Sequence, residues 1–324
     1  MIPYCLAILT GFVILTVSAD RFVLGASALA KNLGVPTLLV GLVIVGFGTS
    51  APEIIVSAMA AWQGNGYLSI GNALGSNITN IGLVLGLAVL ATPMQVHSSL
   101  VKKEIPVLFL VMGFSLFLLV DGRLTPADGV LLVIGTLLML GWTVQQGLKQ
   151  RHKNDPLEQE FADELQTSLS TPQAIFWLSV GMLFLLGSSK LLVWGAVGVA
   201  KFFGVSDLII GLTIVAVGTS LPELAASVMS AIRNEHDLAI GNVIGSNMYN
   251  LLAVMACPGL LGPVNILPEI LSRDFPVMIV LSLALWIMAT GIRSRGIINR
   301  LEGGVLLLSF VGYQYFLFRS IGNG

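Results

Sequence analysis

The sequence predicts an all-α polytopic membrane protein with about ten transmembrane helices, arranged as two inverted five-helix repeats. Of the 324 residues, 55% are hydrophobic and only 10% are charged, whereas soluble domains carry about 25% charged residues. Many apolar runs reach the roughly 20 residues that a helix needs to cross the hydrocarbon core. Two polar motifs also recur at one fixed separation, which indicates an internal duplication.

The duplicated motifs lie inside apolar segments. Residues 48–53 read Gly-Thr-Ser-Ala-Pro-Glu, and residues 218–223 read Gly-Thr-Ser-Leu-Pro-Glu. Residues 71–80 likewise return as residues 241–250. In both cases the second copy is numbered 170 higher than the first. A shared offset favours duplication of one unit over two chance matches.

Apolar segments separated by charged or Pro/Gly-containing breaks divide the chain into two sets of five expected helices. A polar stretch with a basic start and an acidic end separates the sets and predicts a cytoplasmic linker at 149–172. The repeats therefore span 1–148 and 173–324. The expected helices are 3–28, 38–62, 67–92, 105–120 and 127–148, followed by 173–198, 207–232, 237–261, 275–292 and 302–318.

The first segment has an alternative interpretation as a signal peptide, because an apolar run is followed by Val17, Ser18 and Ala19. No Lys or Arg precedes that run, so we expect a retained first helix. Basic residues then set the orientation by the positive-inside rule. With ten on one side and four on the other, the sequence predicts a multi-pass protein of the cell (inner) membrane with both termini outside. The inner set is Lys31, Lys102, Lys103, Lys149, Arg151, Lys153, Arg233, Arg293, Arg295 and Arg300, and the outer set is Arg123, Lys201, Arg273 and Arg319.

An odd number of spans per repeat has a geometric consequence. The second half must enter the membrane from the side opposite to the first, which gives an inverted-topology repeat. Corresponding segments then meet near the midplane from opposite directions. We therefore expect Glu53 and Glu223 to be neighbours in space.

An ionised acidic side chain near the bilayer centre costs roughly 2.5–3.5 kcal/mol on insertion scales, and this chain has two at corresponding places. On a helix, Thr49 and Ser50 share the face of Glu53. Pro52 lacks an N–H, so it leaves the carbonyl of Gly48 without its helical partner and bends the helix. Carboxylates, hydroxyls and freed carbonyls are hard oxygen donors of the kind that Ca²⁺, Mg²⁺ or Na⁺ require. The same reasoning applies to Thr219, Ser220, Pro222 and Glu223.

The following helix of each half supplies neutral oxygens. Asn72, Ser76 and Asn80 form one polar stripe at helical spacing, and Gly71 and Gly75 allow close helix approach. The second copy is Asn242, Ser246 and Asn250 with Gly241 and Gly245. For these stripes, interhelical hydrogen bonding is an alternative interpretation to ion binding.

For the glutamates we favour ion binding, because no intramembrane Lys or Arg lies at a matching position beside them. The offset of 170 also relates Asp20 to Lys190. We expect those two residues to form a structural ion pair.

At these residues the chain resembles the calcium/cation antiporter family, which includes the sodium/calcium exchangers, and in particular its prokaryotic members. The matching segments are the two α-repeats of that family, 41–80 and 211–250. The resemblance implies that Glu53 and Glu223 bind Ca²⁺ and alternately Na⁺ or H⁺. It further implies ligands from Thr49, Thr219, Ser50, Ser220, Ser76, Ser246, Asn80 and Asn250, and from the carbonyls of Gly46 and Ala216. By the same resemblance, the first and sixth helices move across a rigid core.

One departure from the family pattern concerns charge. Some exchangers carry Asp where this chain has Asn250, and both Asn80 and Asn250 are neutral here. The site then holds at most two negative charges, so the sodium stoichiometry and the choice between Na⁺, K⁺ and H⁺ as counter-ion stay open. Two nearby carboxylates would titrate as a coupled pair, which makes proton exchange an option.

The expected function is thus a secondary antiporter that exchanges Ca²⁺ for Na⁺ or H⁺ across a lipid bilayer by alternating access, with a midplane site built on the two glutamates. A divalent cation/proton exchanger or a cation channel that uses the same glutamate pair is the alternative. We expect no enzyme activity, because the membrane motifs contain no nucleophile–base pair, no His and no phosphate-binding Gly loop. No cofactor is expected, since Ca²⁺ and Na⁺ or H⁺ would be substrates. A net charge of −1 gives no indication of nucleic-acid binding.

Overall fold

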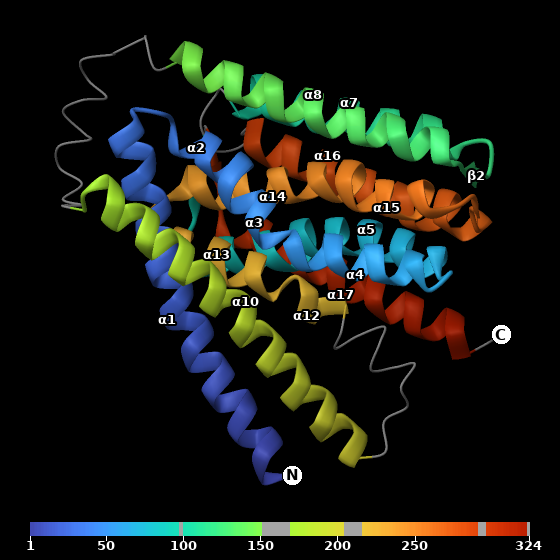
Figure 1. The fold of residues 1–324 in the computed structure, drawn as a ribbon, viewed down its shortest axis with the longest axis horizontal. Coiled ribbons are helices and arrows are strands. Elements are labelled where there is room, and N and C mark those ends of the chain that lie inside the picture. Colours follow the sequence, from blue (N-terminus) through green and yellow to red (C-terminus); the bar gives the residue numbers. More distant parts are fainter. Residues whose placement is uncertain (97–99, 151–168, 204–215, 291–295, 323–324) are drawn as a thin grey trace.

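The computed structural model describes residues 1–96, 100–150, 169–203, 216–290 and 296–322, and these residues form helices with two short sheets (Figure 1). Most of the expected linker at 149–172 and residues 211–215 of the second motif lie outside the described residues. Helical structure in the described parts of the apolar segments confirms the predicted all-α class. In the descriptions that follow, η denotes a π-helical turn.

The first half of the chain is built from helices that are interrupted at several points. Its elements are α1 (Ile2–Leu33), α2 (Thr37–Val40), η1 (Gly41–Val45), α3 (Gly46–Thr49), α4 (Ala51–Trp62), α5 (Gly66–Thr79), η2 (Asn80–Leu85), α6 (Gly86–Ala91), β1 (Met94–Gln95), η3 (Leu100–Glu104), α7 (Ile105–Leu119), β2 (Arg123–Leu124) and α8 (Pro126–Gln150).

The described part of the second half follows the same order. Its elements are α10 (Thr171–Phe202), α12 (Ala216–Thr219), α13 (Leu221–Ile232), α14 (His236–Tyr249), η5 (Asn250–Val254), α15 (Met255–Leu261), β3 (Val264–Asn265), η6 (Ile270–Asp274), α16 (Phe275–Thr290), β4 (Ile297–Ile298) and α17 (Arg300–Gly322). α4, α5 and η3 each have a counterpart (α13, α14 and η6) whose bounds are 170 higher.

Seven described helices are long and apolar enough to cross a membrane, and eight are if the bent pair α3–α4 counts as one span. The bent pair comprises Thr37–Thr49 and Ala51–Trp62, which meet at 40°. The seven are Ile2–Leu33, Gly66–Ala91, Pro126–Gln146, Thr171–Val199, His236–Leu261, Ile270–Thr290 and Arg300–Arg319. The expected total of ten stays a prediction, because α7 is short and much of the expected helix at 207–232 lies outside the described residues.

The two central spans are Gly66–Ala91 and His236–Leu261. Within their apolar windows, 78% and 94% of the residues are buried, against 17–33% in the other five candidates. The outer helices therefore present apolar surface outward, as contact with lipid tails requires. The polar residues of 71–80 and 241–250 lie on these two screened spans, and Glu53 and Glu223 lie on α4 and α13, which pack against them.

Helices α1 and α10 lie side by side and extend diagonally away from the other helices (Figure 1). Phe22, Val23 and Ala26 of α1 are buried with Leu185 of α10. Small residues bring the two backbones together, since a Cβ on Gly181 would lie 2.7 Å from the backbone nitrogen of Phe22. Van der Waals packing over small residues is the usual source of helix association in lipid.

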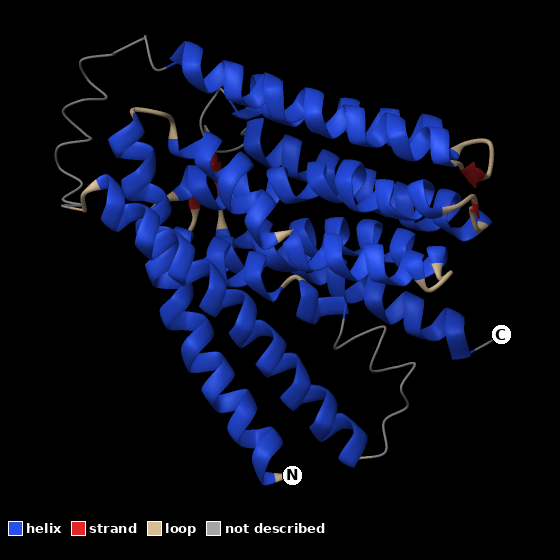
Figure 2. Ribbon diagram, viewed as in Figure 1, coloured by secondary structure: helices blue, strands red, loops and turns tan. Residues whose placement is uncertain are grey.

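Two antiparallel sheets join the halves at opposite ends of the molecule (Figure 2). In one sheet β1 pairs with β4, with Met94 opposite Ile298. In the other, β2 pairs with β3, with Arg123 opposite Asn265. Each sheet contains one strand from each half. Strand pairing therefore joins the two halves at both ends of the molecule.

The ion pair expected between Asp20 and Lys190 is wrong. Asp20 of α1 accepts a hydrogen bond from Arg233 Nε at 2.7 Å, and Lys190 is exposed on α10. Arg233 follows the last residue of α13, a helix that packs against α1. The 170-residue offset could not indicate Arg233 as the partner of Asp20. It relates Asp20 to Lys190, whose side chain is exposed on α10.

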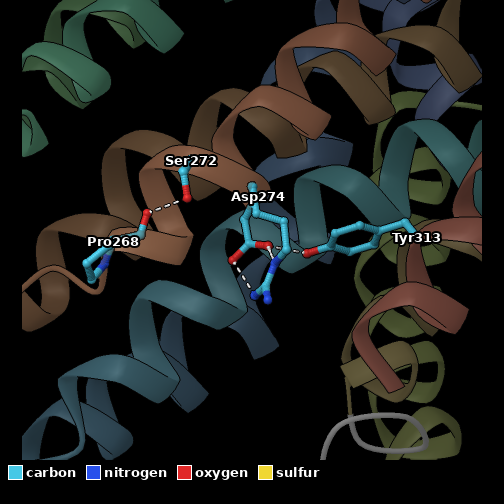
Figure 3. A network of polar contacts seen from close by, with 5 residues as sticks. Pro268, Ser272, Asp274 and Tyr313 are labelled. Carbon is cyan, nitrogen blue, oxygen red and sulfur yellow. Dashed lines mark hydrogen bonds and ion pairs between the residues drawn. The ribbon is translucent and has the colours of Figure 1, made fainter. Parts of the chain in front are cut away.

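A polar network fastens α17 to η6 (Figure 3). The Asp274 carboxylate accepts from Arg273 Nε at 2.6 Å and from the Tyr313 hydroxyl at 2.9 Å. The position 170 earlier is Glu104, which is buried where Asp274 is half-buried, and its Oε2 has no hydrogen-bond partner in the described part of the chain. Burial raises the pKa of Glu104 to about 7.

We predict that Gly181→Ala destabilises the protein by about 1–3 kcal/mol, because the added methyl group would collide with the backbone of α1. Gly187→Ala on the same helix is the matched control, since no described atom lies within 4 Å of its Cβ position. The control should be neutral or up to about 1 kcal/mol more stable, as alanine is the better helix former. Thermal unfolding in detergent measures both. Equal effects of the two substitutions would contradict the packing argument.

Glu104 should make stability depend on pH. Its pKa of about 7 lies above the ordinary 4.5, so the folded protein holds this proton more tightly and loses stability as the pH rises through about 7. We expect the advantage of Glu104→Gln over the wild type to grow by roughly 1–3 kcal/mol between about pH 5 and about pH 8.5. Asp274→Asn, the repeat counterpart, should instead destabilise at both pH values because it disrupts the Arg273 and Tyr313 contacts. If the difference in melting temperature between Glu104→Gln and wild type stays constant across this pH range, the argument is refuted.

Candidate ion-binding site

The site begins where two helices are broken. Ser50 separates α3 from α4 and Ser220 separates α12 from α13, and both have non-helical backbone angles. In α4 and α13 proline is the second residue and glutamate the third. Proline fits the first turn of a helix, where its missing N–H leaves no bond unmade. The bend predicted from Pro52 is thus present, and it places each glutamate at a helix N-terminus, where backbone N–H groups favour negative charge.

Glu53 and Glu223 are both buried, with 0% and 1% exposure. The two carboxylates lie close enough to interact electrostatically, and half-buried Thr219 lies beside Glu53. The neighbourhood expected from the duplication is therefore present in the structure. Two acidic groups buried together require compensation, because moving ions out of water is costly unless they are paired.

Each glutamate is bonded by a serine of the other half. Ser50 Oγ donates to Glu223 Oε1 at 3.2 Å, and Ser220 Oγ donates to Glu53 Oε1 at 3.4 Å. The second oxygen of each carboxylate, Oε2, is buried and has no hydrogen-bond partner among the described residues. Two acceptor atoms are therefore left for a ligand that the described residues do not supply.

Helix α14 forms one wall of the site. Thr49 Oγ1 donates to Asn242 Oδ1 at 3.0 Å and lies 3.5 Å from Ser246 Oγ. Ser246 Oγ in turn donates to the carbonyl of Gly46 at 3.4 Å. Asn242 Nδ2 donates to Ser227 Oγ at 2.8 Å and to the Glu223 carbonyl at 3.3 Å. Residues of the two motif copies are thus interleaved.

Helix α5 forms the opposite wall with fewer contacts. Asn72 Nδ2 donates to the Glu53 carbonyl at 3.1 Å, and Ser76 is buried one turn further along. Gly71 is exposed, whereas its counterpart Gly241 is buried. A Cβ on Gly241 would lie 2.6 Å from the Leu38 carbonyl oxygen. Small residues are therefore needed for close packing against α14 in this structure.

Asn80 and Asn250 begin the π-helical turns η2 and η5. Both are buried; Asn80 Oδ1 and both amide atoms of Asn250 have no partner in the described part of the structure. π-Helical turns are rare and frequently occur at functional sites. Helix propensities in the sequence gave no indication of these π-helical turns. Each turn begins at the last residue of a motif copy, where the polar stripe ends.

The carbonyls expected as ligands differ in their surroundings. That of Gly46 already accepts from Ser246 and from Thr49, both at 3.4 Å. Ala216 begins α12, but the residues before it and its own side chain are not described. The carbonyl of Gly218, which corresponds to the Gly48 carbonyl freed by Pro52, accepts from Ser189 Oγ at 3.1 Å. Ser189 of α10 is a contact that reading the motifs alone missed.

The donor set consists of two carboxylates with hydroxyl, amide and carbonyl oxygens. Within the described ranges, no group of three or more His, Cys, Asp or Glu side chains is arranged to hold a metal ion. This set lacks the nitrogen and sulfur ligands of zinc sites, and its oxygens suit hard cations.

Comparison with known proteins agrees with this geometry. A family model described as sodium/calcium exchanger protein matches residues 4–144 and 173–319. The chain belongs to the sodium/calcium exchanger family. Proteins of this family are transporters rather than enzymes, and this exchanger-family chain is a multi-pass membrane protein.

Individual relatives cover nearly the whole molecule. The antiporter CaxA of Alkalimonas amylolytica is 48% identical over 99% of this chain and 100% of its own length. The inner membrane protein YrbG of Escherichia coli is 38% identical over 85% of each chain. Among solved structures, the sodium-calcium exchanger NCX_Mj superposes with a TM-score of 0.82 at 34% identity, over 95% of this chain and 96% of that one.

The contacts of Asn242 in this exchanger-family protein generate a prediction. Asn242→Ala removes bonds to Thr49, Ser227 and the Glu223 carbonyl, and buried groups left unpaired cost about 1–3 kcal/mol each. We expect a loss of about 2–4 kcal/mol in thermal or denaturant unfolding. Asn72→Ala, the repeat counterpart, breaks one described bond and should cost about 1 kcal/mol. A larger loss for Asn72→Ala than for Asn242→Ala would reverse the predicted order.

Proposed function

We propose that this chain is a secondary antiporter that exchanges Ca²⁺ for Na⁺ or H⁺ by alternating access, with its site built on Glu53 and Glu223. The observation that carries the proposal is the pair of buried carboxylates, each with one oxygen bonded by a serine of the other half and one oxygen left over. A bound cation would compensate both charges. Family membership and the likeness to NCX_Mj support Ca²⁺ and Na⁺ as the transported ions.

The proposed ligands are the oxygens that surround this pair. Hydroxyl and amide groups add coordination without adding charge, which suits an ion that must also leave the site. Besides the glutamates, the set is Thr49, Thr219, Ser50, Ser220, Ser76, Ser246, Asn80 and Asn250, with the carbonyls of Gly46 and Ala216.

The neutral asparagines limit the charge to two. One Ca²⁺, two Na⁺ or two H⁺ would balance Glu53 and Glu223, and a third Na⁺ would leave a net positive charge in a low-dielectric site. The proposal therefore assigns an exchange of one Ca²⁺ for two monovalent cations at this pair.

Two inverted repeats of five helices are the architecture that we propose around the site. The repeated order of elements, with bounds 170 apart, supports the duplication. Counterparts β1 and β3 belong to sheets at opposite ends of the molecule (Figure 2), which supports an inverted relation. The proposed units are 1–148 and 173–324, with both termini outside and the chain in the inner membrane, as the name of YrbG says of that relative.

Alternating access is supported by the unequal packing of the two copies. Residues of α2 and η1 cover α14 at Gly241 and Gly245, whereas Gly71 at the same place on α5 is exposed; residues 207–215, which correspond to α2 and η1, lie outside the described residues. If the halves exchange these arrangements, the site becomes accessible from the other side. Near-equal sequences in two packings are what such an exchange requires.

The test is counter-ion-driven flux in proteoliposomes. Vesicles loaded with radiolabelled Ca²⁺ should release it when an inward Na⁺ or H⁺ gradient is imposed, with each gradient, and a K⁺ gradient, tested separately. Glu53→Gln should lower the rate at least about 100-fold, since removing one of two buried charges costs several kcal/mol of binding. Glu269→Gln, an exposed glutamate outside both motifs, is the control and should leave the rate unchanged.

Two outcomes would overturn the proposal. If Ca²⁺ release from wild-type vesicles equals that from Glu53→Gln vesicles under every gradient, the pair is not a transport site. If Ca²⁺ instead carries current without any counter-ion and without stimulation by ions on the opposite side, the protein is a channel whose glutamates form a selectivity site.

A further inference from the structure

The two central helices bury a set of four asparagine side chains, of which only Asn80 and Asn250 are among the expected ligands. Asn77 and Asn80 come from α5 and η2, and Asn247 and Asn250 come from α14 and η5; none is more than 1% exposed. An amide carries two N–H donors and an oxygen with two acceptor sites. Burying such groups without partners is costly, so a set with several unpaired atoms requires an explanation.

The four amides are not arranged symmetrically. Asn80 Nδ2 donates to Asn247 Oδ1 at 3.1 Å. The counterpart contact, 170 residues away at each position, would join Asn250 to Asn77. Instead, Asn77 Nδ2 contacts Met278 Sδ at 3.3 Å, and both amide atoms of Asn250 have no partner in the described ranges.

In this structure Asn80 Nδ2 faces Asn247 Oδ1, and Asn247 Nδ2 has no partner among the described residues. A cation beside the Asn80 oxygen favours this arrangement over the reversed bond, because only here can Asn247 accept from the Asn80 amide. An asparagine amide can be rotated by half a turn, which exchanges its oxygen with its NH₂ group. With Nδ2 engaged by Asn247, the Asn80 oxygen is the atom left without a partner. A cation requires the oxygen, whereas an N–H presented to it would be repulsive.

We propose that Asn247 is a positioning residue, which holds the Asn80 amide so that its oxygen is free for a transported cation. This inference rests on the proposed function and adds a residue that is not among the expected ligands. Asn247 Oδ1 is the acceptor that fixes the orientation, and Asn247 itself need not touch the ion. Asn77, the repeat counterpart, makes no such bond to Asn250 and therefore serves as an internal control.

The experiment compares Asn247→Leu with Asn77→Leu in Ca²⁺-loaded and Ca²⁺-free protein. Leucine keeps the branched shape and the number of side-chain heavy atoms of asparagine and removes the acceptor. We expect Asn247→Leu to raise the Ca²⁺ concentration for half-maximal exchange about 3- to 10-fold, the equivalent of one hydrogen bond, with a smaller change in maximal rate. The same variant should need correspondingly more Ca²⁺ to raise its melting temperature, and Asn77→Leu should match wild type in both measurements.

A second background separates positioning from general damage. In Asn80→Asp the carboxylate presents an oxygen in either orientation, so adding Asn247→Leu should change the Ca²⁺ requirement less than twofold. The inference is overturned if Asn247→Leu has the same effect in both backgrounds, or if Asn77→Leu equals it in the wild type. Asn247→Ala provides the same comparison where the leucine variant does not fold.

Failure of this inference is distinguishable from failure of the proposed function. Wild-type protein that neither exchanges Ca²⁺ nor is stabilised by it would refute the function. Wild-type exchange together with an unchanged Ca²⁺ requirement in Asn247→Leu would refute only the role of Asn247.

Discussion

The structure depends on one electrostatic constraint: two carboxylates, Glu53 and Glu223, are buried side by side in a protein whose surroundings are largely apolar. Buried charges are tolerated only when other groups compensate them. Here the compensation from the chain is partial, with one serine hydroxyl for each carboxylate and a helix N-terminus behind it. In the proposed function, a bound cation supplies the remaining compensation.

The broken helices follow from the same constraint. A continuous helix would engage its backbone N–H groups internally, whereas the breaks at Ser50 and Ser220 expose helix N-termini beside the glutamates. In lipid such breaks are tolerated only inside protein or along a cavity. The outer helices therefore carry the apolar surface. The breaks lie beside the two central spans, within whose apolar windows 78% and 94% of the residues are buried.

Duplication places the same chemistry in both halves, but the halves do not have the same packing. Asn242 joins three elements while Asn72 makes one described bond to the Glu53 carbonyl, and Gly241 is buried while Gly71 is exposed. Asn80 is held by Asn247, and Asn250 has no described partner. Two nearly identical motifs therefore make different contacts among the described residues, and the proposed alternating access draws on this difference.

The sequence by itself determined the all-α membrane class, the duplicated unit, the bend before Glu53 and the meeting of the two glutamates, because hydropathy, proline and a fixed offset act locally or by symmetry. It did not determine the partner of Asp20, which is Arg233 rather than Lys190, nor the contact of Ser189 with the Gly218 carbonyl. Those contacts join helices distant in the chain, so they depend on the relative rotation and depth of the helices. The different contacts of the two asparagine stripes likewise came only from the tertiary structure. Two nearly identical motifs give identical predictions, and their contacts differ because the neighbouring residues differ.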